Sequence, residues 1–147
     1  MIKFAIERFG EIKGPIAFYK LFINGEPLID QFENEIKKST TYYTECLTIK
    51  AYMDLYSNNG GRLPPKQFKF LKTPQNVKFK CFEFKSKNLR YYGFVFPTTN
   101  EMIICSAEKN DKSEQSADIQ RLINIGNEYL NNLKITIENG KRRAIKK

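Results

Sequence analysis

The sequence contains neither histidine nor tryptophan among its 147 residues, and it has only three cysteines. Without histidine, an enzyme of this sequence must draw its acid–base chemistry from Lys, Arg, Tyr, Asp, Glu or Cys. Cys46, Cys81 and Cys105 lie in apolar runs and form no CxxC pair, which argues against a zinc site. We therefore predict no metal and no cofactor, and we interpret the cysteines as small buried residues in a reducing cytosol.

Long hydrophobic runs are also missing from the sequence. No apolar stretch reaches the roughly 18 residues that a membrane-spanning helix requires. The first ten residues, MIKFAIERFG, lack the apolar core of a signal peptide. We expect a soluble cytoplasmic protein that has no membrane partner.

Acidic residues are fewer than basic ones, 16 against 25, and the formal net charge is +9. Such a balance favours a polyanionic partner, namely a nucleic acid, an acidic protein or an anionic membrane, although a basic surface that serves only solubility has the same charge. Five of the positive charges lie in the last seven residues, KRRAIKK, so the remainder of the chain carries about +4. We predict a single domain over residues 1–137 and a basic, disordered tail over residues 138–147.

The apolar pattern predicts strands near the N-terminus and again after the middle of the chain. Alternation of Ile2, Phe4 and Ile6 with polar residues indicates a strand at 2–9. Largely apolar segments bounded by turn residues indicate further strands at 16–23, 77–85, 89–96 and 101–107. Asn24-Gly25 is either a two-residue hairpin turn or part of a loop before Pro27.

Apolar residues at three- and four-residue spacing predict helices over about 32–57 and 114–133. Ser39-Thr40-Thr41 is a patch of weak helix propensity, so the first of these helices could instead be two helices that meet there.

This order of elements predicts an α+β domain. Its sheet is expected to be small, twisted and mostly antiparallel, because the connections between the later strands are short. Helices pack on this sheet, an extra hairpin precedes it, and a helix ends the domain. The residues expected to be mostly buried are Phe4, Ile6, Leu47, Met53, Phe82, Phe84, Phe94, Ile104, Leu122 and Leu130.

Basic residues gather at the predicted strand ends and turns. Lys85 and Arg90 flank the turn between two strands, and Lys87 lies within it. Lys109 and Lys112 follow the neighbouring strand. Because neighbouring strands lie about 4.8 Å apart, we expect these charges to face one concavity suited to a phosphodiester. The alternative interpretation is that they are solvated residues that protect the edge of the sheet.

Tyr91 and Tyr92 are adjacent and therefore point to opposite faces of their strand. One of them could stack on an RNA base while the other packs in the core, and packing is the commoner role of such tyrosines.

The sequence from residue 82 to residue 122 resembles the RelE/ParE superfamily of toxins, and most of all its HigB-like branch, which is often phage-derived. The order and spacing of four segments carry the resemblance, and no single segment is specific to the family. The segments are Phe82-Glu83-Phe84-Lys85, Leu89-Arg90-Tyr91-Tyr92, Lys109 to Lys112, and Asp118-Ile119. The resemblance implies a RelE-like fold for this region.

The resemblance also implies a function, the toxin of a type II toxin–antitoxin system that cleaves mRNA on the ribosome without a metal ion. In this chemistry a ribose 2′-OH attacks the adjacent phosphate, and the implied partners are ribosome-bound mRNA and a helix-turn-helix antitoxin. Lys85 is then a base or a phosphate clamp, and Arg90 stabilises the phosphorane. Lys109 and Lys112 hold the RNA backbone, and the expected RNA contacts are Lys87, Tyr91 and Tyr92.

The sequence departs from the family pattern at Glu108, where a doubled lysine is usual. A carboxylate at this position leaves other functions open. One is a protein of the toxin fold that binds nucleic acid or protein without cleavage. Another is a ParE-like inhibitor of DNA gyrase, and a third is an unrelated small basic domain.

Overall fold

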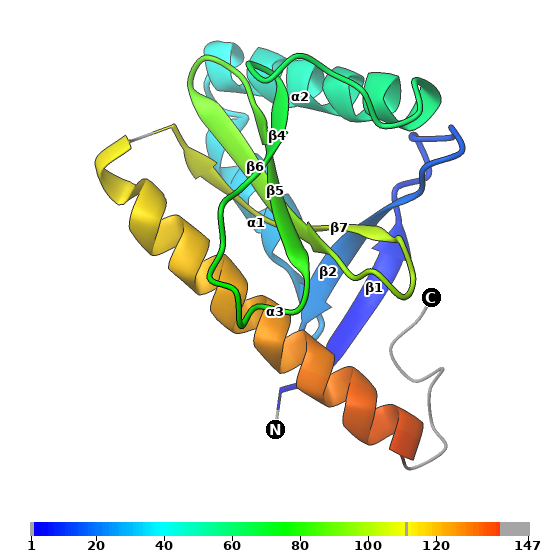
Figure 1. Ribbon diagram of the computed structural model, residues 1–147. Helices are drawn as coiled ribbons and strands as arrows, with labels where there is room; N and C mark the ends of the chain where they lie inside the picture. The colour runs from blue at the N-terminus through cyan, green and yellow to red at the C-terminus, as the bar shows by residue number, and fades with distance from the viewer. Residues whose placement is uncertain (1, 111, 139–147) are drawn as a thin grey trace.

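The computed structural model describes residues 2–110 and 112–138, with side chains described for residues 2–110 and 113–133. The described elements build one sheet flanked by helices (Figure 1). In order they are β1 (Phe4–Arg8), β2 (Phe18–Ile23), β3 (Glu26–Pro27), α1 (Leu28–Ile36), α2 (Thr40–Asn58), β4 (Phe68–Phe70), β5 (Lys80–Lys85), β6 (Leu89–Val95), β7 (Met102–Lys109), a 3-10 turn (Lys112–Glu114) and α3 (Gln115–Glu138).

The described strands form a single sheet in the order β1-β2-β7-β6-β5-β4, and β3 pairs with β2. The pairs are antiparallel except for β2 and β7, which run parallel from Phe18 opposite Met102 to Lys20 opposite Ile104. The predicted α+β class with a mostly antiparallel sheet is therefore confirmed. None of the described helices combines the length and the apolar character needed to cross a membrane.

The predicted N-terminal hairpin is present, and it extends the main sheet. β1 pairs with β2 from Phe4 opposite Ile23 to Arg8 opposite Tyr19. Asn24 and Gly25 both have positive φ, 53° and 81°, as a two-residue turn between antiparallel strands requires. This turn connects β2 to the short strand β3, and the chain enters α1 directly afterwards.

The predicted helix over residues 32–57 is two helices, which was the alternative interpretation of the Ser39 patch. α1 ends at Ile36, and the Ser39 Oγ accepts a hydrogen bond of 3.5 Å from the backbone N–H of Tyr42 at the start of α2. The last helix is longer than predicted, because α3 continues to Glu138. The tail that was predicted to be disordered begins at residue 138. From residue 139 onward it lies outside the described residues.

The sheet separates two apolar cores. α1 and α2 cover one face, with Ile49 and Met53 against Phe82 and Phe84. α3 covers the other face, where Leu122 packs with Phe94 (Figure 1).

Eight of the ten residues predicted to be buried are buried, and Leu130 is partly buried. The prediction for Leu47 is wrong, because 51% of this residue is exposed. The residues of α2 that face the sheet are Cys46, Ile49, Met53 and Tyr56, and Leu47 lies outside this stripe.

Candidate functional site

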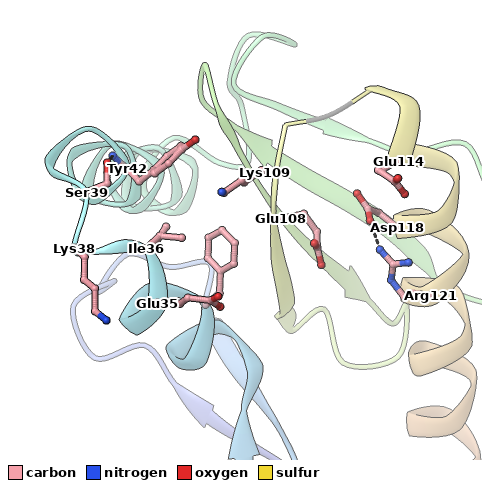
Figure 2. Close-up of a pocket in the computed structure, with 11 residues that line it drawn as sticks. Glu35, Ile36, Lys38, Ser39, Tyr42, Glu108, Lys109, Glu114, Asp118 and Arg121 are labelled. Carbon is pink, nitrogen blue, oxygen red and sulfur yellow. Dashed lines mark hydrogen bonds and ion pairs between the residues drawn. The ribbon is translucent and has the colours of Figure 1, made fainter.

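A cleft of about 680 Å³ lies between the α1–α2 junction and the start of α3, beside the end of β7 (Figure 2). It opens where the pairing of β2 with β7 has ended, since that pairing stops at Ile104 and β7 continues to Lys109. The residues that line it are Phe32, Glu35, Ile36, Lys38, Ser39, Tyr42, Glu108, Lys109, Glu114, Asp118 and Arg121.

The last two residues of β7 place opposite charges in the cleft. Strand alternation directs Lys109 toward the helix pair and Glu108 toward α3. The ammonium nitrogen of Lys109 lies 5.2 Å from the centre of the Tyr42 ring, which is a cation–π distance. Glu108 lies on the side of Asp118 and Arg121 (Figure 2). Both sides of the cleft therefore carry mixed charge, because Lys38 and Lys109 lie with Glu35 on the helix-pair side and Arg121 lies with carboxylates on the α3 side.

The α3 wall holds two carboxyl groups that have raised pKa values. Burial raises the pKa of Glu108, and the neighbouring Asp118 raises it further, against the lowering influence of Arg121. Burial also raises the pKa of Asp118, although Arg121 and the Tyr92 hydroxyl lower it. Arg121 forms an ion pair with Asp118 and leaves 57% of its own side chain exposed. A carboxyl group with a raised pKa beside an exposed cation is suited to proton transfer.

Arg90 lies outside this cleft and is 3% exposed. Its Nη1 is 3.5 Å from Oε1 of the buried Glu83, and its Nε donates a 2.8 Å hydrogen bond to the Oδ1 of Asn110. Gln115 of α3 also donates to Glu83, at 3.4 Å. The guanidinium is therefore neutralised inside the protein, and it does not present its hydrogen-bond donors to a ligand in this structure.

The predicted basic cluster is divided between the two faces of the sheet. Lys85 stands opposite Arg90 in the antiparallel register, so the two residues share the α3 face. Lys109 stands opposite Leu89, which belongs to the core under α1 and α2. The expectation that these three charges face one concavity is therefore wrong, because cross-strand partners share a face and sequence neighbours do not.

Lys87 is exposed in the β5–β6 turn, which α2 holds in place. Glu45 of α2 accepts hydrogen bonds from the Ser86 hydroxyl (2.5 Å), the backbone N–H of Asn88 (2.7 Å) and the Asn88 side chain (2.5 Å). Burial alone would raise the pKa of Glu45, but these hydrogen bonds outweigh it and hold the pKa below its usual range. The turn is therefore fixed, and the Lys87 side chain extends from it into solvent.

Neither tyrosine of β6 is available for stacking on a base, because both are fully buried. The Tyr91 hydroxyl donates a 2.5 Å hydrogen bond to Oε2 of Glu33, and the Tyr92 hydroxyl donates one of 3.5 Å to Oδ2 of Asp118. Burial raises the pKa of Tyr92 to about 12 and that of Tyr91 further. The expected opposite orientation is confirmed, but the expected RNA contact fails for both rings, since each is covered by packing.

Lys112 begins the 3-10 turn before α3, and its side chain lies outside the described residues. Seven residues were predicted for the site, and the structure describes the side chains of six of them. Of these six, Lys109 alone lines the cleft.

Within the described part of the chain, no group of three or more Cys, Asp or Glu side chains is arranged to hold a metal ion. No family model, curated protein or solved structure matches this chain.

Sequence reasoning missed the α3 wall of the cleft. The signals were present: Asp118 and Arg121 are three residues apart, which is ion-pair spacing on a helix, and Glu108 interrupts the basic run. The cross-strand register, and the approach of α3 to the end of β7, could not be predicted from the sequence.

Proposed function

We propose that the protein is the toxin of a type II toxin–antitoxin system, and that it cleaves mRNA on the ribosome at the cleft beside β7. One observation carries the proposal: Lys109 and Arg121 reach the cleft from two different elements, next to carboxyl groups with raised pKa values. Cationic side chains bind a phosphodiester through charge-assisted hydrogen bonds, and its cleavage by a ribose 2′-OH needs a proton acceptor close by.

The proposed reaction begins with proton removal from a ribose 2′-OH by the carboxylate of Glu108. The 2′-oxygen then attacks the adjacent phosphorus, the bond to the 5′-oxygen breaks, and a 2′,3′-cyclic phosphate and a 5′-OH end result. Lys109 and Arg121 stabilise the negative charge that develops on the phosphorane oxygens. A proton from water completes the 5′-OH.

This assignment keeps Lys109 in the site and gives to Arg121 the role that the sequence suggested for Arg90. The reason is exposure, since Arg121 is 57% exposed whereas the side chain of Arg90 is 4% exposed. Each arginine already faces a buried carboxylate, Glu83 for Arg90 and Asp118 for Arg121, so the exposed part of the Arg121 side chain is what remains open to a phosphate.

The test is primer extension on a reporter mRNA in a purified translation reaction, with and without ribosomes. Wild-type protein is expected to produce new 5′ ends in the coding region only when ribosomes translate it. Lys109→Gln is expected to reduce cleavage by about 100-fold, the usual loss when one charge-stabilising group is removed. Lys78→Gln, which removes an exposed charge outside the cleft, serves as the matched control. Equal cleavage by both variants would contradict the proposed site.

A second candidate function is binding of nucleic acid or protein without cleavage. The burial of Arg90 against Glu83 favours it, because the strongest phosphate-binding side chain of the predicted cluster is already paired. Retention of a labelled RNA by wild-type protein that produces no new 5′ ends would support this function. Loss of that binding in Lys109→Gln would assign it to the same cleft.

A further inference from the structure

Helix α2 carries apolar residues on two sides, and only one of them packs on the sheet. Cys46, Ile49, Met53 and Tyr56 are buried against the sheet. On the outer side, Tyr43, Leu47 and Leu55 are 47%, 51% and 47% exposed. These residues and the exposed Ala51 recur every four positions and form one stripe, which we call the outer stripe (Tyr43, Leu47, Ala51 and Leu55). Four such residues in a row on one exposed helix face are typical of an interaction surface.

Two threonines beside the outer stripe form hydrogen bonds within the helix. The Thr44 hydroxyl donates to the backbone oxygen of Thr40 at 2.9 Å, and the Thr48 hydroxyl donates to that of Thr44 at 3.1 Å. Both hydroxyl groups are therefore turned to the helix backbone and do not depend on water for a partner. This arrangement lowers the cost of removing solvent from the face.

The outer face of α2 is also nearly free of charge, in a chain whose net charge is +9. Lys50 is paired with Glu33 at 3.0 Å on the flank of the helix. Asp54 is the charged residue that lies exposed beside the stripe. A second copy of this basic chain can approach here without bringing cations together, which most of a basic surface would not allow.

We propose that the outer stripe binds the same stripe of a second copy, with the two α2 helices antiparallel and the two-fold axis at Ala51. Leu47 and Leu55 each lie four residues from Ala51. Antiparallel pairing therefore places Leu47 of one copy against Leu55 of the other, and the two-fold axis repeats this contact on the other side of Ala51. The small side chain of Ala51 allows the helix backbones to approach closely at the axis. Asp54 then lies opposite Thr48, whereas parallel pairing would place the two Asp54 carboxylates side by side.

The pairing leaves the cleft beside β7 open. Tyr42 and Ser39 are the α2-side residues that line the cleft, and neither belongs to the outer stripe. The proposed dimer therefore does not depend on the proposed nuclease function, and a negative result for one leaves the other untouched.

Sedimentation velocity of the full chain tests the association. Wild-type protein is expected to sediment as a dimer, and the double variant Leu47→Glu/Leu55→Glu as a monomer, because four carboxylates would then meet in the interface. The control is Asn127→Glu, which adds charge to an exposed position on α3 and is expected to remain dimeric. A monomeric wild type, or a double variant that remains dimeric, would overturn the proposal. Both substituted leucines are exposed, so the fold is expected to survive, and circular dichroism checks this.

Disulfide trapping tests the position of the axis. Ala51→Cys is expected to cross-link two copies on mild oxidation, because antiparallel pairing about this residue brings the two Cα atoms within the range of a disulfide. Asn58→Cys is expected to remain reduced, since antiparallel pairing separates the two copies of that residue. The three native cysteines are buried and free. Absence of the Ala51→Cys cross-link would overturn the proposed axis, and cross-linking of both variants would indicate parallel helices instead.

Discussion

The Tyr91 hydroxyl donates a 2.5 Å hydrogen bond to Oε2 of Glu33, which connects the centre of the sheet to helix α1. The other carboxylate oxygen of Glu33 holds Lys50 of α2 at 3.0 Å. One carboxylate therefore binds a strand and two helices together. Because α1 and α2 form one wall of the cleft, this contact holds that wall to β6, the strand that pairs with β7.

Removal of the hydroxyl in Tyr91→Phe is expected to destabilise the protein by about 1–2 kcal/mol. This is the cost of losing a hydrogen bond to a charged acceptor that remains partly hydrated. Glu33 keeps Lys50 and some contact with water, which limits the loss. Urea unfolding measures the change. Tyr92→Phe is the matched control, because its hydrogen bond to Asp118 is long, at 3.5 Å, and its loss should cost less. Equal losses in both variants would contradict the importance of the Glu33 contact.

The ion pair of Arg90 and Glu83 predicts a structural phenotype for a residue that the sequence suggested as catalytic. Arg90→Leu leaves the carboxylate of Glu83 buried with the exposed Lys69 at 3.7 Å and the Gln115 amide at 3.4 Å, and we expect a loss of about 3 kcal/mol. The double variant Glu83→Leu/Arg90→Leu removes both charges and is expected to recover much of that loss. Urea unfolding of the single and double variants gives the coupling between them. A fully additive result would contradict the pairing.

The strands from residue 80 to residue 109 could be predicted because each is a short, largely apolar run bounded by turn residues, and β6 and β7 are buried on both faces. The break at Ser39 was visible only as weak propensity, and the structure shows that its hydroxyl caps α2. Leu47 was misassigned because α2 has apolar residues on both sides, so that periodicity alone does not say which side meets the sheet.

The candidate site was harder to predict than the fold. Glu83 and Arg90 are seven residues apart, and only the cross-strand register makes them neighbours on one face. Arg121 approaches Glu108 because α3 crosses the sheet near the end of β7, which no local pattern indicates. The residues that line the cleft come from α1, α2 and their junction, β7, the 3-10 turn and α3, so the arrangement of their charges follows from tertiary packing and not from spacing in the sequence.

Gly93 is expected to be irreplaceable for steric reasons. A Cβ at this position would lie 2.2 Å from the backbone oxygen of Ile103 and 2.5 Å from the ring of Phe82. The first neighbour is backbone and cannot move aside, so Gly93→Ala is expected to destabilise by about 3 kcal/mol, at the upper end of overpacking effects. Gly10→Ala is the control, because a Cβ there meets nothing within 4 Å. Thermal unfolding measures both, and a stable Gly93→Ala protein would contradict the close packing of β6 on β7.

The raised pKa of Glu108 predicts how stability changes with pH. Since burial and Asp118 raise the pKa in the folded state, folded Glu108 binds its proton more tightly than unfolded Glu108 does. The contribution of this residue to stability is therefore complete below the pKa of the unfolded state, and it decreases as the pH rises through the folded-state pKa. Glu108→Gln removes this titration, so its stability relative to wild type is expected to increase between pH 4 and neutral pH. Urea unfolding of both proteins at a series of pH values measures the difference. Parallel curves for the two proteins would show that Glu108 keeps an ordinary pKa and is not poised for proton transfer.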